Sequence, residues 1–118
     1  MKPSDFRSLI AVCGLSNREA ASALALADDR LVRRLKSGDE DATPEIESRL
    51  IVLAGDVLAA QMLRSLNLAA GGKVNLATLR ISEDVIHVES DLSEPVAMAV
   101  RAVILRKLAE TGLKIEKR

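Results

Sequence analysis

Apolar residues recur at helical spacing in four to five stretches of the chain, and turn or cap residues bound most of them. The first stretch starts at a Ser4 cap and ends at Gly14, with an apolar stripe of Phe6, Leu9, Ile10 and Cys13. Apolar residues make up 48% of the 118 residues, which is enough for a hydrophobic core. A small helical protein is therefore the starting expectation.

Two short helices are predicted next. Ser16 and Glu19 have the spacing of a capping box, which marks the start of the second helix. A break follows at residues 25–27. Asp28 then caps a third helix that ends at Gly38 and buries Leu31, Val32 and Leu35.

Two longer helices are predicted further along the chain. Thr43 as a cap and Pro44 at the first helical position indicate a helix that runs to about Asn67. The last helix, Val96–Glu110, follows a Ser-Glu-Pro start and is apolar on most of its surface.

Two segments carry the functional signal, Gly14–Ala21 (GLSNREAA) and Val32–Gly38 (VRRLKSG). Together they predict a short capped helix, a break and a second short helix with a basic outer face. Two such helices at a steep angle can place the second one in the major groove of DNA. Arginine there neutralises phosphate and can pair bidentately with guanine. Between positions 30 and 36 lie four cations and no acid: Arg30, Arg33, Arg34 and Lys36.

These segments resemble the helix-turn-helix of the Cro/phage-repressor (XRE) family, over Phe6 to about Leu53. The chain is similar to compact phage autorepressors, including small regulators encoded beside anti-CRISPR genes. It departs from the family pattern at the turn glycine, which is Ala25, and at the aromatic of the recognition helix, which is Leu35. The resemblance implies a homodimeric transcriptional repressor of phage or mobile-element type that binds an inverted-repeat operator in double-stranded DNA and represses its own operon.

The resemblance also implies roles for individual residues. Asn17 and Arg18 would contact phosphate at the start of the second helix. Helical spacing predicts that the outer face of the third helix carries Asp29, Arg30, Arg33 and Lys36, flanked by Arg34. Asp29 could accept from a cytosine amino group or orient a neighbouring arginine, and we favour the second role. The alternative for the whole cluster is an ordinary solvated basic face.

Between the two long helices the apolar period changes to that of strands. Val74–Ile81 and Ile86–Val88 flank Ser82–Asp84, a pattern that predicts a β-hairpin. The expected fold class is mainly α with a small β-hairpin: an N-terminal helix-turn-helix bundle plus a C-terminal β-hairpin/helix dimerisation unit. We expect a DNA-binding domain at residues 1–67, which includes the long fourth helix, and a dimerisation region at residues 68–118.

A dimer is expected because the last helix is apolar nearly all round and a partner subunit could bury it. The alternative is a well-packed monomeric core. The residues predicted to form the dimer contact are Val88, Val96, Val100, Val103, Ile104 and Leu108.

Composition excludes several classes of function. The formal net charge is zero, so a DNA-binding claim depends on a local patch. Phe6 is the one aromatic residue, which argues against base stacking on single strands. One cysteine and one histidine make a zinc site improbable, and His87 beside Glu89 has no third ligand or nucleophile. We expect a cytoplasmic protein, not an enzyme, with no cofactor, no metal and no membrane contact.

Two other functions remain open. One is an antitoxin, whose C-terminal half would also bind a toxin, although such proteins more often use a flexible tail and only the last six residues here have that character. The other is a protein-interaction module that kept the helical fold without DNA binding, which the acids at Asp28 and Asp29 and the zero net charge would suit.

Overall fold

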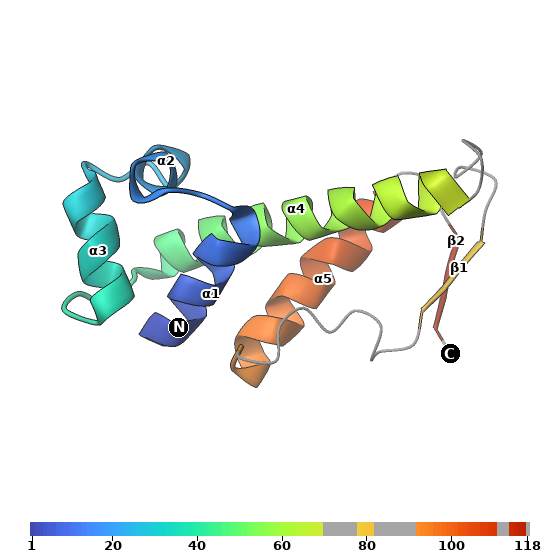
Figure 1. Ribbon diagram of the computed structural model, residues 1–118. Helices are drawn as coiled ribbons and strands as arrows, with labels where there is room; N and C mark the ends of the chain where they lie inside the picture. Colours follow the sequence, from blue (N-terminus) through green and yellow to red (C-terminus); the bar gives the residue numbers. More distant parts are fainter. Residues whose placement is uncertain (70–77, 82–91, 111–113, 118) are drawn as a thin grey trace.

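The computed structural model describes residues 1–69, 78–81, 92–110 and 114–117. Within these ranges the chain forms helices and two short strands. The short helices α2 and α3 lie near the amino-terminal end of the long helix α4 (Figure 1). The elements in chain order are α1 (Pro3–Cys13), α2 (Asn17–Ala23), α3 (Asp29–Ser37), α4 (Pro44–Ala69), β1 (Thr78–Ile81), α5 (Glu94–Glu110) and β2 (Lys114–Lys117).

The starts of α2 and α3 are built as the capping pattern predicts. The Glu19 N–H donates to Ser16 Oγ at 3.2 Å, and the Ser16 N–H donates back to Glu19 Oε1 at 3.1 Å. These bonds hold the pKa of Glu19 below its usual value. Asp28 Oδ1 accepts from the Leu31 N–H at 3.2 Å, which confirms Asp28 as the cap of α3.

The start of α1 differs from the prediction, because Ser4 lies inside the first turn and does not cap the helix. The helix begins at Pro3, whose missing N–H suits the first helical position. Asp5, which is 1% exposed, accepts the Lys2 N–H at 3.1 Å. Its carboxylate also accepts the N–H and the Oγ–H of Ser93, each at 2.8 Å, just before α5 begins. One buried carboxylate therefore joins the start of α1 to the start of α5.

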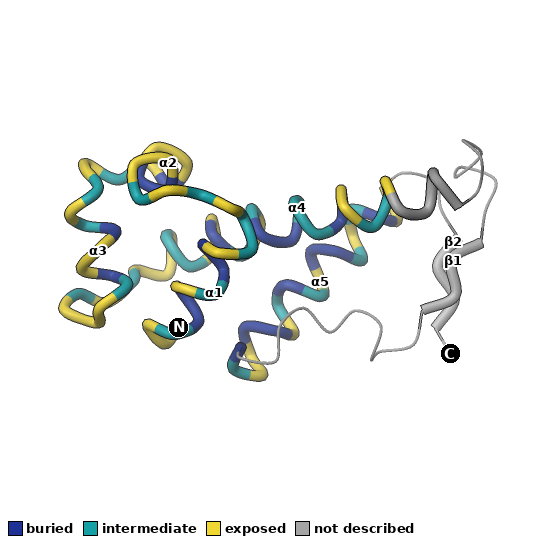
Figure 2. The backbone as a smooth tube through the Cα atoms, viewed as in Figure 1, coloured by how far each residue is buried: buried dark blue, intermediate teal, exposed yellow. Residues whose placement is uncertain are grey.

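The hydrophobic core lies where α1, α4 and α5 face one another, as the buried stretches in Figure 2 show. Leu9 of α1 and Leu50 of α4 are fully buried there, and α5 contributes Val100, Ile104 and Leu108. Since α5 adds to the same buried cluster as α1, the last helix is part of the chain's own core.

α4 and α5 approach each other closely at Gly55. A Cβ at this position would lie 2.7 Å from Val103 Cβ, which is closer than two carbon atoms can pack. Glycine inside a helix costs about 1 kcal/mol relative to alanine. Here the missing side chain is what lets the two helices cross so closely.

The predicted fold class is wrong, because the described residues contain no β-hairpin. β1 pairs in parallel with β2, with Thr78 opposite Lys114 and Ile81 opposite Lys117. Parallel strands need a crossover, and α5 lies between β1 and β2 in the chain. Alternation of apolar residues signals a strand but not its partner or direction, which explains the error. The second predicted strand, Ile86–Val88, lies outside the described residues, and the tail expected to be flexible contains β2.

Candidate nucleic-acid interface

α2 and α3 are two short helices that cross steeply at one end of the molecule (Figure 1). The segment Leu24–Asp28 joins them, and within it Ala25 has a φ of 56°. This left-handed conformation costs an L-residue about 1–2 kcal/mol, and glycine adopts it freely. Ala25 therefore occupies a turn position that favours glycine.

α3 has one buried side and one exposed basic side. Val32 and Leu35 are buried in the core. Arg30, Arg33 and Arg34 are exposed on the other side of the helix. Within the described part of the chain, the guanidinium groups of Arg30 and Arg34 have no ion-pair partner. This surface, Arg30, Arg33 and Arg34, is called the α3 basic face below.

Asp29, the first residue of α3, contacts one arginine of the α3 basic face. Asp29 Oδ2 contacts Arg33 Nη2 at 3.1 Å, and the Arg33 side chain is still 64% exposed. The pair lies one helical turn apart, so Asp29 restricts the guanidinium without burying it. This geometry agrees with the orienting role predicted for Asp29, which stays a prediction with respect to DNA.

The prediction that Lys36 lies on the outer face of α3 is wrong. It is half-buried, and its Nζ donates to Asn17 Oδ1 at 2.5 Å. The reason is helical spacing: Lys36 follows the buried Val32 by one turn and therefore faces α2. The bond joins the first residue of α2 to the end of α3, while the neighbouring Arg18 is exposed.

Sequence reasoning missed Arg7. Its Nη1 donates to the carbonyl oxygen of Lys36, which places an exposed cation from α1 beside the end of α3. Lysine and arginine near the end of a helix commonly bond its last carbonyls. Nothing in the local pattern around Arg7 links it to α3, because the contact depends on how α1 packs.

The residues predicted for a dimer contact lie inside the chain. Val88 is outside the described residues. The other five are at most 8% exposed within one chain: Val96, Val100, Val103, Ile104 and Leu108. They are buried within one chain, where α5 packs mainly against α4, so their apolar character does not require a partner subunit. A role in dimerisation stays a prediction.

Other candidates for chemistry have little support. Burial raises the pKa of the Cys13 thiol, which lowers its thiolate fraction and its reactivity. His87, Glu89 and Gly71–Lys73 lie outside the described residues. Among the residues that are described, no group of three or more His, Cys, Asp or Glu side chains is arranged to hold a metal ion. No described helix is both long enough and apolar enough to cross a membrane.

Comparison with protein-family models, with curated proteins and with solved structures finds no match to this chain.

Proposed function

We propose that the chain is a sequence-specific DNA-binding repressor that acts in the cytoplasm as a homodimer on an inverted-repeat operator of its own operon. The observation that carries this proposal is the α3 basic face. Three arginines share one exposed side of a short helix whose other side is fixed in the core, so α3 can enter a groove without unfolding anything.

The surroundings of α3 suit a phosphate backbone. Arg18 is exposed at the start of α2, and Arg7 is exposed beside the end of α3. Cations on both sides of a groove-reading helix contact phosphates and fix its register on the duplex. The Asn17–Lys36 bond holds α2 and α3 in one arrangement, which lowers the entropy lost on binding.

The test is fluorescence-polarisation binding to the DNA upstream of the gene and to scrambled DNA of equal length, across a salt series. Selective binding that weakens steeply with salt is expected. The double variant Arg33→Ala/Arg34→Ala should bind about 100-fold more weakly, since each arginine–guanine contact is worth about 1–3 kcal/mol. Arg64→Ala/Arg106→Ala removes the same charge from exposed sites on α4 and α5 and is the matched control.

The outcomes separate the alternatives. Equal binding to both DNAs at every salt concentration would exclude autoregulation. Equal losses in the two double variants would mean that only total charge matters. Absence of DNA binding would favour the protein-interaction module.

A further inference from the structure

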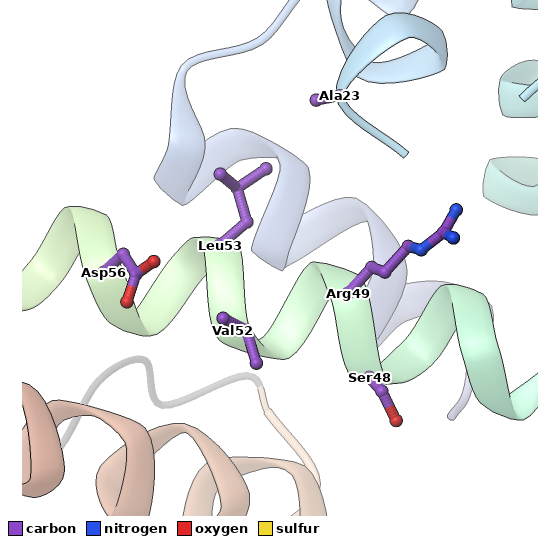
Figure 3. Close-up of a pocket in the computed structure, with 6 residues that line it drawn as sticks. All are labelled: Ala23, Ser48, Arg49, Val52, Leu53 and Asp56. Carbon is purple, nitrogen blue, oxygen red and sulfur yellow. The ribbon is translucent and has the colours of Figure 1, made fainter. Parts of the chain in front are cut away.

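α4 carries a surface hollow between the end of α2 and α5. Ala23 of α2 closes one side, and the rest comes from α4 (Figure 3). The residues that line the hollow are Ala23, Ser48, Arg49, Val52, Leu53 and Asp56. Val52 is 38% exposed, and Met98 is the other large apolar side chain that is exposed in the described part of the chain. We call this lining the α4 surface.

Opposite charges flank Val52 and Leu53 on this surface. Arg49 and Asp56 lie at either end of the hollow, two helical turns apart (Figure 3). Arg49 donates to the Leu24 carbonyl at 3.1 Å and to Glu45 at 2.9 Å, yet its side chain is 46% exposed. A guanidinium has five N–H donors, so Arg49 can bond further acceptors.

Asp56 is partly exposed at the other end of the hollow. Its Oδ1 is buried and lies 3.6 Å from Lys107 Nζ, while the Asp56 side chain as a whole is 40% exposed. An ionised carboxylate accepts several hydrogen bonds, so its exposed part can accept a further donor. The α4 surface therefore offers a donor at one end and an acceptor at the other.

This arrangement is self-complementary. Arg49 and Asp56 are equally far along the helix from the midpoint of Val52 and Leu53. A second α4, antiparallel about a two-fold axis at that midpoint, would set each Arg49 opposite Asp56 of the other copy and each Val52 opposite Leu53 of the other copy. A two-fold interface uses the same patch on both subunits, which is what this charge order requires.

We propose that the α4 surface binds a second copy of this chain in antiparallel orientation. The inference rests on the proposed function for its biological meaning, because it names the contact of the homodimer. Met98, the other exposed large apolar side chain among the described residues, lies on α5 and does not line this hollow. The apolar face of α5 that was expected to dimerise is occupied by the chain's own core.

The position of the axis also suits an operator. It lies about 13 Å along α4 from Pro44, at about 1.5 Å per residue, so the two α4 starts would be about 26 Å apart. α3 lies beyond that end of α4 (Figure 1). The two α3 helices would then be further apart than the α4 starts. Their separation would therefore exceed about 26 Å and approach the roughly 34–36 Å between half-sites.

The test is the mass of the full chain by sedimentation equilibrium without DNA. The wild type should be a dimer. Arg49→Asp sets two acids opposite each other across the axis, and Asp56→Arg sets two cations opposite each other, so each variant alone should dissociate at least tenfold more readily. An equimolar mixture of the two should recover the dimer, because each heterodimer contact is then oppositely charged. This recovery also excludes misfolding as the cause of dissociation.

Val52→Lys should dissociate the dimer in the same way, and Met98→Lys, at an exposed site on α5, is the matched control. Three results would each contradict the proposal that the α4 surface forms the dimer contact. They are a monomeric wild type, a dimer that persists in Val52→Lys, and a mixture of the two charge variants that stays monomeric. DNA binding is measured separately on the same samples. Selective DNA binding by a dimer that persists in Val52→Lys would overturn this inference and leave the proposed function standing.

Discussion

The two ends of the molecule are stabilised in different ways. α2 and α3 are short, begin at side-chain caps, and expose most of their charged residues. α4 and α5 are long and bury their apolar residues against each other and α1. The helices at the first end start at hydrogen bonds between residues close together in the sequence. The helices at the second end are held by packing between residues far apart in the sequence. The arginines of the α3 basic face are therefore free for binding because they contribute little to holding the fold together.

Asp5→Asn should have the largest effect, since it acts on the end that depends on packing. Burial raises the pKa of Asp5, but the hydrogen bonds from Ser93 and Lys2 outweigh it and bring the pKa below the ordinary 3.8. Bonds to a charged group are worth about 1.5–3 kcal/mol. The amide introduced by Asp5→Asn would keep one acceptor oxygen and turn its NH2 group toward one of the two N–H donors, from Lys2 or Ser93. We expect a loss of about 3 kcal/mol in urea unfolding at pH 7.

The pH dependence has a definite sign. Because the folded pKa of Asp5 lies below the unfolded value, its stabilisation is complete above about pH 5 and is lost as pH falls below about 4. The loss of stability between pH 5 and pH 2 should be smaller in Asp5→Asn than in the wild type. Asp41→Asn, at an exposed site between α3 and α4, is the control. Equal pH profiles for wild type and Asp5→Asn would contradict the prediction.

Gly55→Ala should come next in size. Helix propensity favours alanine by about 1 kcal/mol, but overpacking against Val103 costs about 1–3 kcal/mol or more. We expect a net loss of about 2 kcal/mol, measured by urea unfolding. Val103→Ala in the same chain removes the γ-methyl group that faces Gly55 but keeps the Cβ. It therefore relieves part of the clash, and the double variant should be more stable than the sum of the two single effects predicts. Simple additivity would mean that α4 and α5 do not meet at this point.

Ala25→Gly should stabilise the end that contains α2 and α3 by about 1 kcal/mol. Glycine adopts the positive φ of the turn between these helices without the steric strain that alanine has there. The melting temperature would rise by a few degrees. Gly14→Ala is the opposite control, since Gly14 has a φ of 67° and an open space around it. A lower melting temperature in Ala25→Gly would show that the turn does not have this conformation in solution.

Arg33→Ala/Arg34→Ala should have the smallest effect on stability, within about 0.5 kcal/mol, because both side chains are exposed. The surface ion pair of Arg33 with Asp29 contributes little. Urea unfolding checks this on the sample used for DNA binding. A loss above about 1 kcal/mol would mean that the α3 basic face is part of the fold and would weaken the contrast between the two ends.

Local signals in the sequence were enough to predict the helices and the caps of α2 and α3. Ser16, Glu19 and Asp28 act within three residues of their partners, so a one-dimensional pattern contains the whole interaction. The features that the sequence could not show are contacts between residues far apart in the chain. The parallel pairing of β1 with β2 joins segments separated by α5. The contact of Arg7 with α3 likewise follows from helix packing.

The bond between Asp5 and Ser93 joins residues 88 positions apart. A ribosome adds about 5–20 residues per second, so Asp5 is made roughly 4–18 s before its partner. During that interval the residues of α2 and α3 have already been translated. The residues of the α3 basic face are therefore made before Ser93, and the hydrogen bonds that join α1 to the start of α5 cannot form until translation has passed Ser93.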